Sequence, residues 1–62
     1  MNEVFLKDVK LGGFFRFRPS LTALSWIRGS HERITDKYVC VMKDATEHIL
    51  LRNGLLVVFV ED

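Results

Sequence analysis

Basic and aromatic side chains are interspersed through the middle of the chain, and this set is the strongest candidate for binding chemistry. Arginine side chains neutralise phosphates, and an exposed indole ring stacks on nucleic-acid bases. The six residues of the set are Arg16, Arg18, Trp26, Arg28, Arg33 and Lys37. They predict a nucleic-acid-binding strip with Trp26 as stacking platform. The alternative interpretation is purely structural: the arginines are outward residues of half-buried strands, and Trp26 seals the rim of the fold.

The net charge weighs against the first interpretation. The formal net charge is +1, from nine Lys and Arg against eight Asp and Glu, which gives no strong general attraction to nucleic acid. Nucleic acid is therefore the second choice of partner.

The residue types that catalysis and metal binding require are sparse. Cys40 lies in an apolar run and is expected to be an inert core thiol, because activation of a cysteine needs a nearby cation or base. His31 and His48 have no second ligand two or four residues away, whereas a catalytic zinc ion takes three protein ligands. Ser30-His31-Glu32 are adjacent in sequence, and adjacency does not form a catalytic triad. We predict no enzyme activity, no metal, no cofactor and no small-molecule substrate.

Length and composition predict one small domain over residues 1–62. A chain this short has a marginal core unless disulfides, a metal or a partner supplement it, and one cysteine forms no disulfide within the chain. Hydrophobic residues make up 48% of the sequence, so much apolar surface must be hidden. The charged N-terminus and the short apolar run Leu55–Val60 predict neither a signal peptide nor a membrane span. We expect a cytoplasmic protein.

The C-terminal third has the clearest local pattern. Asn53-Gly54 separates the apolar runs Ile49–Arg52 and Leu55–Val60, and this dipeptide favours the type I′ turn of a two-residue β-hairpin. One face of that hairpin is predicted to be core and consists of Ile49, Leu51, Leu56, Val58 and Val60. The other face is half apolar and is predicted to bind a protein or a second copy of the chain. Its apolar residues are Leu50, Leu55, Val57 and Phe59. The N-terminal segment Val4–Leu6 either covers this face or pairs with a neighbouring chain.

Three further segments have strand character. Lys37–Met42 is β-branched and aromatic, and the length of the turn after it leaves open whether Tyr38 and Cys40 or Val39 and Val41 face inward. Phe14–Arg18 alternates aromatic and basic residues, which predicts a half-buried strand with Phe15 and Phe17 inward. Residues 20–28 form either a short helix or, as we favour, a strand over 24–28, and residues 30–36 are polar and predict a loop. About five strands result, typical of a small barrel or a curled antiparallel sheet.

Four sequence fragments together resemble short uncharacterised phage and prophage proteins. They are Val9-Lys10-Leu11-Gly12, Phe15-x-Phe17, Trp26-Ile27-Arg28-Gly29 and Lys37-Tyr38-Val39-Cys40-Val41. The resemblance implies a small five-stranded SH3-like barrel and a phage-type accessory role in the host cytoplasm. It departs from the usual pattern in an insertion over residues 19–23.

The two-sided apolar hairpin and the small size favour a non-enzymatic adaptor or modulator. It acts through protein–protein contacts, as a homodimer or on a larger protein. Nucleic-acid binding is the alternative, and a structural subunit of a larger assembly is the third possibility.

Overall fold

Short runs of β-branched and aromatic residues, separated by turn residues, form a structure that is mainly strand. The computed structural model describes residues 1–61. Its elements are β1 (Asn2–Phe5), the 3-10 turn η1 (Leu6–Asp8), β2 (Phe14–Phe15), β3 (Trp26–Glu32), β4 (Lys37–Met42), β5 (Ala45–Asn53) and β6 (Val57–Val60). Over this part of the chain, no helix has the length and apolar character needed to cross a membrane.

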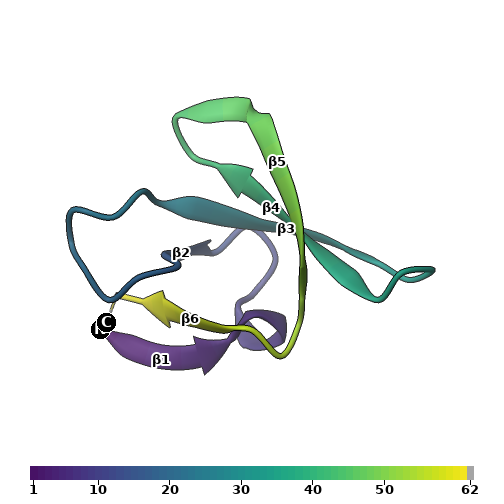
Figure 1. Cartoon of the computed structure of the whole chain (residues 1–62), viewed down its shortest axis with the longest axis horizontal. Coiled ribbons are helices and arrows are strands. Elements are labelled where there is room, and N and C mark those ends of the chain that lie inside the picture. Colours follow the sequence, from purple (N-terminus) through teal and green to yellow (C-terminus); the bar gives the residue numbers. More distant parts are fainter. Residues whose placement is uncertain (62) are drawn as a thin grey trace.

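The strands form two antiparallel sheets, one with the order β1-β6 and one with the order β2-β3-β4-β5. Figure 1 shows β1 and β6 side by side below the larger sheet, with the start of β1 paired to the end of β6. The sheets are linked where Arg16 and Phe59 exchange two backbone hydrogen bonds, of 2.8 and 2.9 Å. The predicted mainly β, antiparallel class is confirmed, with six strands in place of five. The sheets are not closed into a barrel.

The core lies between the two sheets and is small. The buried apolar side chains are Leu6, Val9, Phe15, Trp26, Cys40 and Val58. Phe17 links two of them, because its ring makes edge contacts with Phe15 and with Trp26, both at 5.2 Å between centroids. The turn η1 contributes Leu6, which is fully buried in this core.

The predicted C-terminal hairpin is wrong. β5 pairs with β4 and β6 pairs with β1, so the two apolar runs belong to different sheets. Neither Asn53 nor Gly54 has the positive φ that a type I′ turn requires. Instead Leu56 N donates to Asn53 O at 3.1 Å and Leu55 N donates to Asn53 Oδ1 at 2.8 Å, an Asx-type turn that directs the chain out of the larger sheet.

The strand over Lys37–Met42 has the predicted bounds, and its orientation is now settled. Cys40 is buried against the core, so Val39 and Val41 point to the opposite face. Met42 pairs with Ala45 across a two-residue turn, and Val41 already pairs with Ile49, so β5 contains a bulge between these positions.

Residues 20–36 follow the prediction in part: the favoured strand over 24–28 is present from Trp26 onward in place of a short helix. Residues 20–25 form neither helix nor strand, and β3 begins at Trp26 and continues to Glu32, through half of the predicted polar loop. The tight turn 33–36 then closes the β3–β4 hairpin, with Asp36 at φ 54°. In Figure 1 this hairpin extends well beyond the small sheet.

Candidate functional site

The structure does not bring together the four residues predicted to bind a protein. Leu50 packs against the core on the inner side of the larger sheet, whereas Val57 and Phe59 lie on the outer side of β6. Leu55 is exposed in the turn between the two sheets. The prediction failed because it assumed that β5 and β6 pair, and a strand paired elsewhere presents a different face.

A different apolar surface covers the outer face of the larger sheet. Two rows of paired residues run across it, because directly paired residues share a face of a sheet. The surface, here named the outer face, consists of Phe14, Ile27, Val39, Val41, Ile49 and Leu51. Its side chains point away from those of Phe15, Trp26 and Cys40, which are in the core. Nothing in residues 1–61 packs over it as a second layer: Phe14 is 58% exposed and Ile49 57%.

The sequence contains a pattern that indicates the outer face. Val39-Cys40-Val41 and Ile49-Leu50-Leu51 are apolar at consecutive positions, whereas a strand with one side in water alternates between apolar and polar residues. Consecutive apolar residues indicate a strand that is covered on both sides. Sequence reasoning found this property in β5 and assigned it to the wrong face.

The predicted basic-aromatic strip is not a single surface. Trp26 is 8% exposed and packs against Phe17, so its ring is a core element and is not a stacking platform. Arg33 lies in the exposed turn 33–36, and Lys37 pairs with Glu32 at the start of β4. Arg18 is exposed in the segment after β2.

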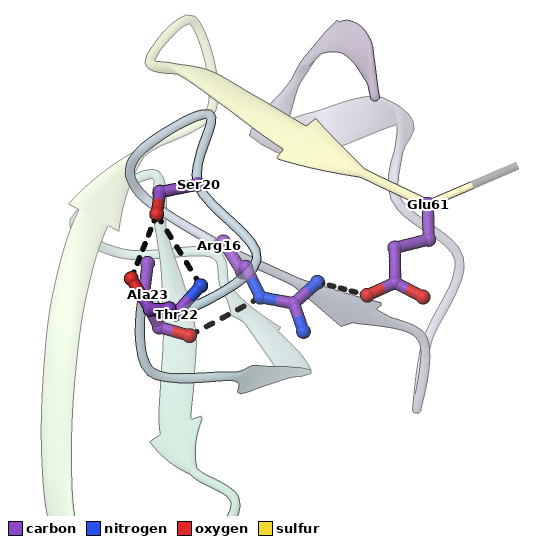
Figure 2. A network of polar contacts seen from close by, with 5 residues as sticks. All are labelled: Arg16, Ser20, Thr22, Ala23 and Glu61. Carbon is purple, nitrogen blue, oxygen red and sulfur yellow. Dashed lines mark hydrogen bonds and ion pairs between the residues drawn. The ribbon is translucent and has the colours of Figure 1, made fainter.

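Arg16 has a structural role. Its guanidinium forms an ion pair with Glu61, and its Nε donates to the carbonyl of Ala23 at 3.2 Å (Figure 2). Ser20 Oγ accepts from the Thr22 backbone N at 3.3 Å and lies 2.9 Å from Thr22 Oγ1, as Figure 2 also shows. Arg16 thus ties the segment 20–25 and the end of β6 to β2.

Arg28 belongs to a separate group of polar side chains that sequence reasoning did not assemble. On β3 and β4, Arg28 Cζ lies 4.6 Å from the centroid of the Tyr38 ring, and the His31 ring stacks on Tyr38 at 4.5 Å with an interplanar angle of 26°. Arg52 on β5 is the direct partner of Tyr38. We name Arg28, His31, Tyr38 and Arg52 the arginine–ring cluster. The bulge in β3 between Arg28 and His31 creates this neighbourhood, and local sequence patterns do not report such a bulge.

Cys40 lies beside this cluster and is fully buried. Burial raises the pKa of its thiol above the ordinary value of 9.0, and the charges of Arg52 and Arg28 oppose this shift to a smaller extent. The thiol is therefore protonated and unreactive at neutral pH. Within residues 1–61, no three His, Cys, Asp or Glu side chains are grouped so that they could hold a metal ion.

We expect iodoacetamide to alkylate Cys40 in the folded protein at least about tenfold more slowly than in urea-unfolded protein, because the thiolate forms and is reached only on opening. The raised pKa also stabilises the fold below the ordinary thiol pKa. This contribution disappears as the pH rises through the folded-state value, so alkaline destabilisation should be weaker in Cys40→Ala. Equal alkylation rates in folded and unfolded protein would contradict the assigned burial.

Comparison of the chain with family models, with curated proteins and with solved structures gives no match.

Proposed function

We propose that the protein is a non-enzymatic interaction module that self-associates through the outer face. The observation that carries the proposal is an apolar sheet face that is left without a covering layer by residues 1–61. A sheet buries each apolar face against another layer, and exposed contiguous apolar patches mark interaction surfaces. The core on the other side of the sheet has only six buried residues, so a second layer would add substantially to stability.

The charges at the two ends of the outer face favour a second copy as the covering layer. Lys43 lies at one end, with its Nζ 5.5 Å from the centroid of the Phe14 ring. Glu32 and Lys37 pair at the other end, and the side chains between the two ends are apolar. A two-fold axis through the middle of the face places the Lys43 end of one copy over the Glu32–Lys37 end of the other. The apolar rows then pack on each other as in a sheet sandwich.

Pairing through the free edge of β5 is the less favourable way to join two copies. β5 pairs with β4 alone, so its other edge is open. The bulge between Ala45 and Ile49 interrupts the regular ladder of that edge, and bulges protect edge strands from pairing with other chains. The flat side of the sheet, rather than its edge, is therefore the proposed contact.

Sedimentation equilibrium over a concentration series tests the proposal. The wild-type protein is expected to form dimers, and Ile49→Lys is expected to weaken dimerisation at least about tenfold. Burying an isoleucine side chain contributes about 1.5–3 kcal/mol, and about 1.4 kcal/mol corresponds to a tenfold change in the dissociation constant. Ile49 is more than half exposed in the single chain, so the variant should still fold.

Ile34→Lys is the matched control. Ile34 is 94% exposed in the turn 33–36, outside the outer face, and the substitution makes the same change of shape and charge. Dimerisation should be unchanged in this variant. A wild-type protein that remains monomeric throughout the series, or equal losses in the two variants, would refute the proposal.

From the resemblance to short phage proteins we further propose a fold family and a biological role for this protein. We propose that the two sheets, linked by the bridge between Arg16 and Phe59, are the halves of a small SH3-like barrel. We also propose that the protein has a phage-type accessory role in the host cytoplasm. The support is the antiparallel strand order and the bridge between the sheets. An experimentally determined structure compared with SH3-like barrels tests the fold, and capture of a host protein by the wild type but not by Ile49→Lys tests the role.

A further inference from the structure

The arginine–ring cluster carries charge that the fold does not neutralise. Between residues 1 and 61 the arginine ion pair is Arg16–Glu61, and His31 Nε2 is hydrogen-bonded to Asp36 Oδ1 at 2.8 Å. Neither Arg28 nor Arg52 has an acidic partner there, although both are close enough to Cys40 to affect its thiol. The Arg52 side chain donates to a neighbouring backbone carbonyl, that of Leu51, at 2.9 Å. Two guanidinium groups on one side of the sheet are therefore left for an external anion.

The residues around Arg28 and Arg52 hold the cluster in a defined arrangement. Arg28 lies over the Tyr38 ring, and its Nε is buried without a hydrogen bond, so this side chain is packed in place rather than free in solvent. Arg28 pairs with Cys40, which pairs with Leu50, and the next row of the same face joins His31, Tyr38 and Arg52. The cluster therefore lies directly next to the buried core on the same face of the sheet.

Planar groups next to the arginines narrow the class of ligand. Arg28, Tyr38 and His31 form a stack, and the His31 side chain is about one-third exposed. Bases stack on aromatic rings and on guanidinium planes, whereas the Asp and Glu side chains of an acidic peptide carry no ring that could stack there. Two guanidiniums beside a partly exposed ring match the phosphate and the base of one nucleotide unit.

We propose that the arginine–ring cluster binds single-stranded nucleic acid, with Arg28 and Arg52 on a phosphate group and the His31 ring against a base. This activity is separate from self-association, because the cluster lies on the inner side of the sheet whose outer face is proposed to dimerise. The net charge of +1 implies weak, local binding of a short segment.

Fluorescence anisotropy of a labelled single-stranded oligothymidylate, titrated with the full chain at two salt concentrations, tests the proposal. We expect salt-dependent binding that falls about tenfold in Arg52→Gln and in Arg28→Gln, since hydrogen bonds to charged groups are the strong ones. Each variant should also lower the salt slope, by at most about 0.7, the value for one phosphate contact on a single strand. Arg52 is exposed, so its variant should fold even if Arg28→Gln does not.

Arg18→Gln is the matched control, because it removes the same charge from an exposed position outside the cluster. It should bind as the wild type does, and Ile49→Lys should bind whether or not it dimerises. Three results would overturn the proposal: affinity unchanged in Arg52→Gln and Arg28→Gln, full competition by inorganic phosphate at equal concentration, or tighter binding of an oligoglutamate peptide than of the oligonucleotide.

Discussion

Phe15→Ala is expected to remove a large fraction of the protein's free energy of unfolding. Truncation of a buried phenylalanine costs about 3–5 kcal/mol, through lost burial and the cavity that remains. A domain of this length has a free energy of unfolding of only about 3–9 kcal/mol, at roughly 0.05–0.15 kcal/mol per residue. Phe15 is one of six buried apolar residues, and its ring also supports Phe17, so the site has little capacity to repack.

Urea unfolding followed by circular dichroism measures this loss, and Phe14→Ala is its control. Phe14 is the same residue type on the same two-residue strand, but it points to the outer face. In dilute protein, where dimers dissociate, Phe14→Ala should change the free energy of unfolding by less than about 1 kcal/mol. If the two alanine variants lose equal stability, the assignment of faces to β2 is wrong.

Gly54→Ala is expected to lower the free energy of unfolding by about 1–3 kcal/mol, through overpacking. A Cβ atom at Gly54 would lie 2.6 Å from Tyr38 Cε1 and 3.1 Å from the Cβ of Lys7. The Tyr38 ring is held in the stack with Arg28 and His31, so it cannot move aside freely. Gly54 is therefore required by the close approach of a side chain, and the positive φ expected of Asn53-Gly54 plays no part.

A double-mutant cycle with Tyr38→Ala isolates this contact, measured by urea unfolding of the four proteins. Once the Tyr38 ring is removed, Gly54→Ala should cost less than it does in the wild type, because only the contact with the Cβ of Lys7 at 3.1 Å remains, so the two substitutions should be non-additive. Additive losses would show that the alanine acts through the backbone of the turn and not through the ring. The same displacement of Tyr38 should weaken oligonucleotide binding if the arginine–ring cluster is the site.

The turn at Asn53 illustrates the limit of local patterns. The sequence predicts that the chain reverses there, and it does, with the Asn53 side chain accepting from Leu55 N. Which turn forms depends on distant residues: Leu6 N donates to Leu56 O at 2.8 Å, and Lys7 N donates to Gly54 O at 3.0 Å. The N-terminal segment thus pairs with the residues that the hairpin prediction had paired with β5.

Local sequence patterns are equally limited in predicting which arginines lie together in a binding site. Arg16, Arg18, Arg28 and Arg33 look equivalent in sequence, as basic residues close to aromatic or apolar ones. The fold separates them, because Arg16 pairs with Glu61 near the opposite end of the chain while Arg28 meets Tyr38 across the β3–β4 hairpin. Arg52 and His31, outside the predicted set, join Arg28 through strand pairing.

Residue types alone determined the mainly β class, the bounds of the strand Lys37–Met42 and the presence of more apolar strand surface than one small core can hide. These properties follow from local preference and from alternation along a single strand. The tertiary structure alone decided that β6 pairs with β1, that Leu50 faces inward while Ile49 and Leu51 face outward, and that Arg28 and Arg52 lie on the same side of the larger sheet. Pairing with a distant segment selects the face that a strand presents, and a shift of one residue reverses every side chain on it.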